Sequence, residues 1–138
     1  MSAMNSTAQT PPKQPAPGQA ARVVLVLDDH VALREELAEY FGSMGYQVMQ
    51  AGDGPSLSVA LRQHRPDLAV LDIDLPGWNG IEIAQAIHRR DPSIRIILMT
   101  GNPNWVTPAL STSSGAFALV EKPIELARLS RVVKAALL

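Results

Sequence analysis

The chain has no cysteine among its 138 residues, which excludes disulfide bonds, thiol catalysis and cysteine-based metal sites. Its formal net charge is only −1, so bulk electrostatics give no reason to expect nucleic acid or an anionic membrane as a partner. The N-terminus lacks an apolar signal core, and no apolar run approaches the ~20 residues of a membrane span. We therefore expect a cytoplasmic protein with no direct nucleic-acid or membrane partner.

Residues 1–21 differ in composition from the rest of the chain. Four of the eleven prolines lie in this segment, and it has no periodic apolar pattern. Such a segment cannot bury enough surface to offset its chain entropy, so we expect it to be disordered. Residues 22–138 are enough for one domain of ordinary size, and a hydrophobic content of 46% is enough for a core.

Strand-like and helix-like segments alternate from residue 22 onward. The strand-like segments are mostly continuous apolar runs, typical of strands covered on both faces, and they are 23–28, 46–51, 68–72, 94–99 and 117–121. Apolar residues recur at helical spacing in segments 31–44, 56–64, 80–90 and 124–138. This alternation predicts an α/β fold of the (βα)5 type, a doubly wound five-stranded parallel sheet with right-handed crossovers and helices on both faces.

The segment 103–114 departs from the helical pattern. Pro103 can begin a helix, but Pro108 interrupts one, and the Ser/Thr-rich end of the segment has weak helix propensity. We expect a short or irregular helix of low local stability here, and a tolerant surface loop is an equally good interpretation.

Four of the predicted strands deliver polar side chains at their C-terminal ends, the edge where an open parallel sheet binds ligands. Three of these side chains are carboxylates, which would repel one another if all were ionised. Mg²⁺ with oxygen ligands is the usual resolution, while a lysine and a hydroxyl can contact phosphoryl oxygens. Without a glycine-rich phosphate cradle, the set fits a carboxylate that itself becomes phosphorylated. The residues are Asp28, Asp29, Asp72, Thr100 and Lys122.

Each of these residues has a simpler interpretation when it is taken alone. Asp29 could cap the helix that begins near Val31. Lys122 could be an ordinary solvated lysine, and Thr100 could be a strand-end hydroxyl satisfied by the backbone. The combination favours the metal and phosphoryl site over these separate interpretations.

Several short motifs follow one another along residues 22–138. They are Leu27-Asp28-Asp29, Leu71-Asp72-Ile73-Asp74-Leu75-Pro76-Gly77 with Gly80, Met99-Thr100-Gly101, Gly115-Ala116 and Glu121-Lys122-Pro123. Each motif is weak alone, but in this order and at this spacing they resemble the receiver domain of bacterial two-component response regulators. The resemblance implies the flavodoxin-like strand order 2-1-3-4-5.

The resemblance also implies roles for individual residues. Asp72 would be the phosphoacceptor. Asp28 and Asp29 would hold Mg²⁺ (Mn²⁺ is an alternative) together with the Asp72 side chain and the backbone carbonyl of Asp74.

By the same resemblance, Thr100 and Lys122 would contact the phosphoryl group. The peptide bond between Lys122 and Pro123 is expected to be cis, as X-Pro bonds permit. Gly101 would leave room beside the hydroxyl of Thr100.

The function that follows from this resemblance is phosphoryl acceptance. A histidine kinase or a histidine phosphotransfer protein would donate the phosphoryl group to Asp72. The chain would catalyse only its own phosphorylation and dephosphorylation, so we do not expect an enzyme. The face formed by residues 103–138 would respond and contact a downstream protein or output domain, or a second copy of the chain in a phosphorylation-linked homodimer.

Two positions depart from the family pattern. Leu119 stands where the family usually has Tyr or Phe, and Phe117 would share a strand face with it. We therefore hypothesise that signalling relies more on ordering of 103–114 than on an aromatic flip. Asp74 is an acid at a variable position, and we hypothesise that it modulates the lifetime of the phosphoryl group through water or the metal.

Other classes of protein share some of these features. A degenerate receiver would act by protein contact without phosphate, although all five site residues are present. Asp72-Ile73-Asp74 also matches the DxD of haloacid-dehalogenase-like phosphatases, but those enzymes carry it on the first strand. A nucleotide-binding Rossmann domain would need a Gly-x-Gly-x-x-Gly after the first strand, which is lacking.

The last predicted helix runs to the end of the chain at Leu138. We therefore expect either a stand-alone receiver or a piece of a longer regulator. The proline-rich stretch at the front favours a complete protein or the N-terminal end of a longer one.

Overall fold

The computed structural model describes residues 21–138. The predicted disordered segment, 1–21, lies outside the described residues apart from Ala21, so its disorder stays a prediction. Within residues 21–138, no helix combines the length and hydropathy needed to cross a bilayer.

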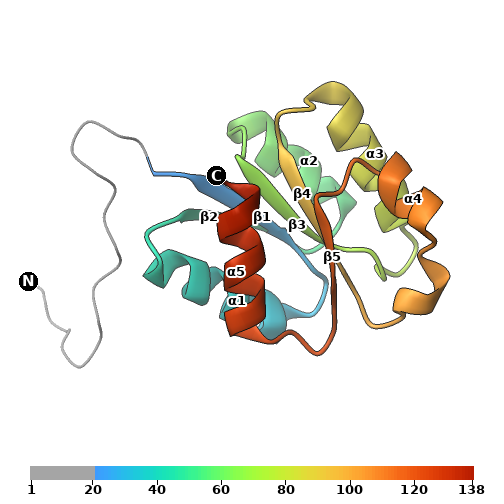
Figure 1. The fold of residues 1–138 in the computed structure, drawn as a ribbon. Helices are drawn as coiled ribbons and strands as arrows, with labels where there is room; N and C mark the ends of the chain where they lie inside the picture. The colour runs from blue at the N-terminus through green and yellow to red at the C-terminus, as the bar shows by residue number, and fades with distance from the viewer. Residues whose placement is uncertain (1–20) are drawn as a thin grey trace, which may run out of the picture.

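Five parallel strands form one sheet in the order β2-β1-β3-β4-β5, as the resemblance implied. The strands are β1 (Val23–Leu27), β2 (Gln47–Ala51), β3 (Leu68–Asp72), β4 (Arg95–Thr100) and β5 (Ala118–Glu121). Figure 1 shows the sheet running through the middle of the domain, with helices on both sides. The predicted α/β fold class is therefore confirmed.

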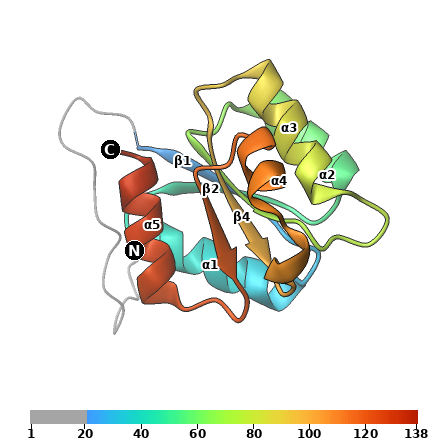
Figure 2. The same cartoon turned by 45° about the vertical axis from the view of Figure 1, so that its right-hand side comes forward.

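The helices cover the two faces of the sheet unequally. The α-helices are α1 (Val31–Ser43), α2 (Gly54–Gln63), α3 (Gly80–Arg90), α4 (Pro108–Ser113) and α5 (Leu126–Ala136), and the 3-10 helix η2 is Pro103–Trp105. Helices α1 and α5 lie side by side on one face, while α2, α3 and α4 lie on the other (Figure 2).

The alternation of side chains along the strands divides the core into two halves. In β1, Leu25 and Leu27 face α2 and α3, whereas Val24 and Val26 face α1 and α5. All five residues of β1 and all five of β3 are buried, because these strands have neighbours and helices on every side. Each buried leucine contributes roughly 1.5–3 kcal/mol to stability relative to an exposed one. Burial of these two central strands therefore fixes the position of their C-terminal ends.

The N-cap residue of helix α1 is not Asp29, the residue that the sequence offered as an alternative cap. His30, not Asp29, is the N-cap residue, and its Nδ1 accepts a hydrogen bond of 3.2 Å from the backbone N–H of Leu33. The alternative interpretation of Asp29 as a helix cap is therefore wrong. Its carboxylate does not cap the helix, and it lies beside those of Asp28 and Asp72.

Helix α2 begins two residues earlier than predicted. The Asp53 side chain accepts a hydrogen bond of 2.8 Å from the N–H of Ser56, and the Ser56 hydroxyl in turn accepts from the N–H of Asp53. This reciprocal capping places the start of the helix at Gly54.

The segment 103–114 is irregular, as predicted. It consists of the single 3-10 turn η2 and the short helix α4, which is capped by Thr107 through a 3.1 Å hydrogen bond from the N–H of Leu110. Neither η2 nor α4 contains a buried residue, so little apolar burial holds this segment in place.

Candidate functional site

Two carboxylates are buried at the C-terminal edge of the sheet. Asp28 follows β1 and is 0% exposed, and Asp72 ends β3 and is 2% exposed. They lie close together because β1 and β3 are paired in parallel, with Leu27 opposite Leu71. Burial of two acids is costly unless each finds a partner, so the surroundings of this pair decide what the site can do.

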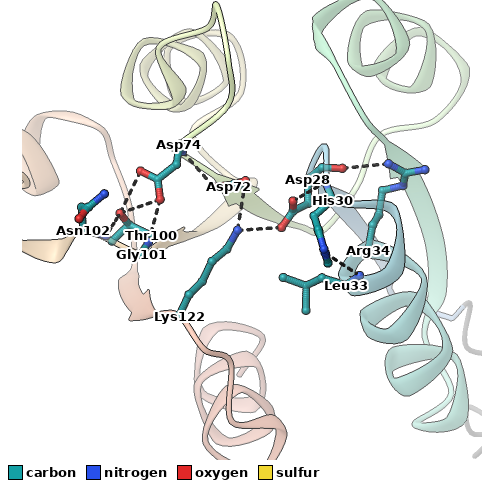
Figure 3. Close-up of polar contacts among 10 residues, drawn as sticks. All are labelled: Asp28, His30, Leu33, Arg34, Asp72, Asp74, Thr100, Gly101, Asn102 and Lys122. Atoms are coloured by element: carbon teal, nitrogen blue, oxygen red, sulfur yellow. Dashed lines mark hydrogen bonds and ion pairs between the residues drawn. The ribbon is translucent and has the colours of Figure 1, made fainter.

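Lys122 is the shared partner of both carboxylates. Its Nζ lies 3.1 Å from Oδ2 of Asp28 and 3.2 Å from Oδ2 of Asp72, as the close-up in Figure 3 shows. The lysine side chain is 22% exposed, and it reaches the pair from the loop after β5. One cation therefore compensates two buried anions, which leaves the site with an excess of negative charge.

The electrostatic balance shifts the pKa values within this cluster. Burial raises the pKa of Asp72 above its ordinary 3.8, and the charge of Asp28 adds to the rise, while the N–H of Asp74 and the ammonium of Lys122 oppose it. Burial alone would lower the pKa of Lys122, but the charges of Asp28 and Asp72 outweigh burial and raise it. Asp72 is thus a more basic carboxylate than a solvated one, which favours a nucleophilic role.

The donor set of the site fits a hard divalent cation. Asp28, Asp29 and Asp72 each offer a carboxylate oxygen, and these oxygens lie within 4.8 Å of one another. Asp29 is exposed, whereas the other two are buried. Oxygen ligands of this kind are what Mg²⁺ and Mn²⁺ prefer.

Asp74 lies on the opposite side of Asp72 from this cluster. Its backbone N–H donates a 2.9 Å hydrogen bond to Oδ1 of Asp72, while its carboxylate turns toward the end of β4. There it accepts hydrogen bonds from the Thr100 hydroxyl, 3.1 Å from each oxygen, and from the Gly101 N–H at 2.7 Å. These contacts were not predicted from the sequence.

Thr100 is fully buried at the end of β4. Besides contacting Asp74, its hydroxyl oxygen accepts a 2.9 Å hydrogen bond from the N–H of Asn102, and its backbone carbonyl accepts one of 2.7 Å from the N–H of Lys122. A Cβ added to Gly101 would lie 3.8 Å from Asp74 Oδ2, an ordinary contact. The space beside Thr100 therefore does not depend on glycine.

The remaining residues singled out in the sequence lie on and after β5. Leu119 is half-buried and packs against the core on the α2–α3 side of the sheet. Phe117 precedes the strand and is 46% exposed, so it does not take the place of a buried aromatic. The Lys122–Pro123 peptide bond is cis, which confirms the prediction.

One contact that supports the site was missed from the sequence. The Arg34 guanidinium donates a 2.9 Å hydrogen bond from Nη1 to the backbone carbonyl of Asp28 and one of 3.2 Å from Nε to Oε1 of Gln50. Arg34 thereby links the loop after β1 to helix α1 and strand β2. The only signal for this contact in the sequence is the position of Arg34 in the first turn of α1, three residues after Val31 and close to the loop that holds Asp28.

Comparison with known proteins gives a consistent result. The family model described as response regulator receiver domain matches residues 24–134. The DNA-binding response regulator MtrA of Mycobacterium tuberculosis is 35% identical over 114 residues, which are 83% of this chain and 50% of MtrA. The chain thus spans about half the length of that relative.

Relatives of similar length match over most of both chains. Sporulation initiation phosphotransferase F of Bacillus subtilis is 34% identical over 111 residues, 80% of this chain and 90% of that protein. A CheY-like receiver domain protein from Methanospirillum hungatei superposes with a TM-score of 0.80 at 25% identity, covering 86% of this chain and 94% of its own. With the fold, the strand-end residues and these matches in agreement, the chain belongs to the response regulator receiver domain family.

Proposed function

We propose that Asp72 accepts a phosphoryl group from a phosphohistidine in a Mg²⁺-dependent reaction. The observation that carries this proposal is the environment of Asp72. It is a buried carboxylate with a raised pKa, it contacts the Lys122 ammonium, and its oxygen lies within 4.8 Å of those of Asp28 and Asp29. An arrangement of this kind supplies a nucleophile, a fixed positive charge and the oxygen ligands of a cation in one place.

The reaction forms an oxygen–phosphorus bond at Asp72 and breaks the phosphorus–nitrogen bond of the donor. The electron pair of the broken bond stays on the imidazole nitrogen, which takes up a proton. Lys122 already touches Asp72, so its charge can offset the charge that grows on the phosphoryl oxygens. Mg²⁺ held by Asp28, Asp29 and Asp72, with the carbonyl of Asp74, would neutralise further charge there.

Thr100 and Lys122 would transmit the effect of phosphorylation to the rest of the domain. Thr100 is directly linked to Asn102 by a hydrogen bond, and Asn102 precedes the weakly held segment 103–114. Lys122 leads through Pro123 into α5. We therefore propose that phosphorylation alters the face formed by residues 103–138.

The partners in this proposal are a histidine kinase or a phosphotransfer protein upstream and a protein or output domain downstream. A phosphorylation-linked homodimer through the same face is an alternative to a separate downstream protein. A cytoplasmic location stays a prediction.

A phosphatase of the DxD type is not favoured by the geometry. Such an enzyme would need Asp74 as an acid–base group, whereas the Asp74 carboxylate accepts hydrogen bonds from Thr100 and Gly101.

The test uses a small phosphodonor, so that no partner has to be known. The protein is incubated with acetyl phosphate or phosphoramidate, in Mg²⁺ and in parallel in excess EDTA, and phosphorylated protein is separated by phosphate-affinity electrophoresis. The proposal predicts a shifted band that needs Mg²⁺ and disappears with hydroxylamine, which cleaves acyl phosphates. A band that resists hydroxylamine or forms equally in EDTA would contradict it.

A further inference from the structure

The carboxylate of Asp74 is held by donors that belong to a neighbouring strand. Figure 3 shows it turned away from Asp28 and Asp72 and toward Thr100 and Gly101. Both of its oxygens are used, since Oδ1 faces the Thr100 hydroxyl and Oδ2 faces that hydroxyl and the Gly101 N–H at 2.7 Å. An anion therefore already occupies the hydroxyl and amide donors at the end of β4.

We propose that Asp74 is an internal competitor for the phosphoryl group, whose carboxylate must leave Thr100 and Gly101 before a phosphoryl group on Asp72 can use them. This inference rests on the proposed function, because it concerns how that function is regulated at the same site. It makes Asp74 a positioning residue that sets the threshold for phosphorylation.

The competition follows from the number of hydrogens available. Thr100 has one hydroxyl hydrogen and Gly101 has one amide hydrogen, so neither donor can fully serve two anions at once. The backbone N–H of Asp74 binds Asp72 Oδ1 at 2.9 Å, which keeps the two acids next to each other. A phosphoryl group on Asp72 would bring about two negative charges beside the Asp74 carboxylate, and the repulsion would favour release of that carboxylate.

The burial of the two partners indicates which one moves. Thr100 is fully buried, whereas the Asp74 side chain is exposed and can rotate into water without leaving a buried charge behind. The departure of Asp74 would free the Thr100 hydroxyl, to which the N–H of Asn102 is bound at 2.9 Å. Displacement of the competitor is thus connected to the start of segment 103–114 without any buried aromatic switch.

The test measures the binding of beryllofluoride in Mg²⁺, because this tetrahedral phosphoryl mimic attaches to a carboxylate without requiring turnover. Binding to the full chain is followed by tryptophan fluorescence, since Trp78 lies in the loop after β3. The variants are Asp74→Ala, which removes the competitor, and Asp74→Asn, which keeps one acceptor oxygen without the charge. Glu82→Gln, an exposed position in the first turn of α3, is the charge-matched control.

The proposal predicts a graded result. Removing one charge-assisted competitor is expected to tighten beryllofluoride binding roughly tenfold in Asp74→Ala, with Asp74→Asn intermediate and Glu82→Gln like the wild type. Mg²⁺ binding measured without beryllofluoride is expected to change much less than beryllofluoride binding, because the carboxylate of Asp74 is not among the metal ligands. Equal beryllofluoride affinities in all four proteins would overturn the inference while leaving the proposed function intact.

A double-mutant cycle with Thr100→Ala separates competition from a general structural effect. If Asp74 acts through Thr100, Asp74→Ala tightens binding less in the Thr100→Ala background than in the wild type. An identical gain in both backgrounds would contradict the proposed contact. Absence of both beryllofluoride binding and phosphorylation in the wild type and all variants would overturn the proposed function, and this inference with it.

Discussion

Lys122 and Asp28 are 94 residues apart in the sequence, yet the ammonium group of one lies 3.1 Å from the carboxylate of the other. Asp28 has no exposed surface, so its charge is compensated almost entirely by what the fold brings to it. The contact joins the two outer limits of the site, the end of β1 and the end of β5. It also makes the lysine part of the folded structure as well as of the proposed chemistry.

Replacement of Lys122 is therefore expected to destabilise the domain when no metal is added. Lys122→Met would leave the buried carboxylates of Asp28 and Asp72 facing each other without their shared cation. Loss of one partner of a buried pair costs several kcal/mol, and because Lys122 is partly exposed we expect the free energy of unfolding to fall by about 2–3 kcal/mol.

The measurement is urea denaturation in EDTA. Lys134→Met, an exposed position in the last turn of α5, is the matched control and is expected to change little. Equal destabilisation by the two substitutions would show that the ion pairs of Lys122 do not stabilise the fold.

Asp72→Asn is expected to stabilise the folded domain when no metal is added, in contrast to Lys122→Met. The raised pKa of Asp72 means that its ionised form is less favourable in the folded chain than in the unfolded one. That penalty is absent below the unfolded pKa of 3.8 and is fully present once the pH has risen through the folded pKa. At neutral pH and without metal, the neutral Asn side chain should therefore raise the thermal midpoint.

With Mg²⁺ present, we expect the wild type to have a higher thermal midpoint than Asp72→Asn. A cation bound by the folded wild type stabilises it by mass action, and Asp72→Asn removes one of its proposed ligands. Thermal unfolding of both proteins at pH 7, with EDTA and with increasing Mg²⁺, checks both statements. A thermal midpoint of the wild type that does not respond to Mg²⁺ would count against the metal site.

Two glycines in helices make a contrasting pair. A Cβ on Gly80, at the start of α3, would collide with the backbone of Ile73, whereas one on Gly42, near the end of α1, would meet nothing within 4 Å. Alanine is the better helix former, so Gly42→Ala should stabilise by about 0.5–1 kcal/mol. Gly80→Ala should instead destabilise by about 1–3 kcal/mol through overpacking next to Asp72. Chemical denaturation that moves both variants in the same direction would contradict the packing seen at Gly80.

Segment 103–114 is expected to gain protection when the protein is phosphorylated. The segment has no buried residue in η2 or α4 and is attached to the site through Asn102 and Thr100, so its opening free energy is low and sensitive to the site. Hydrogen exchange with and without beryllofluoride measures this directly, with α1 as the internal reference. Equal protection of the segment in both conditions would eliminate the hypothesis that ordering replaces an aromatic flip at Leu119.

The sheet could be predicted because its strands carry their own pattern. Val23–Leu27 is an apolar run followed directly by Asp28, and Leu68–Asp72 is an apolar run that ends in acid. Continuous apolar runs of this kind are typical of central strands in a parallel sheet. The helix ends were predicted less well. Near Asp28 and Asp29, the cap proved to be His30, because one acid is drawn into the buried pair and the other lies beside it.

The contact between Asp74 and Thr100 was not predicted, because it depends on the direction in which the Asp74 side chain turns. Asp72 is paired with Met99 across the sheet, so Thr100 lies one residue beyond the acceptor on the neighbouring strand, and an acid two residues after Asp72 lies within reach of it. That spacing was a usable signal for the Asp74–Thr100 contact. Which way the carboxylate turns, toward the metal or toward the hydroxyl, depends on the loop geometry and not on any periodicity.

Phosphorylation of Asp72 is tested most directly by the intact mass of the protein after incubation with Mg²⁺ and acetyl phosphate, for the wild type and for Asp72→Asn. If Asp72 is the phosphoacceptor, the wild type gains one phosphoryl group and the variant gains none. A phosphoryl group on both proteins would place the acceptor elsewhere and contradict the assignment of Asp72.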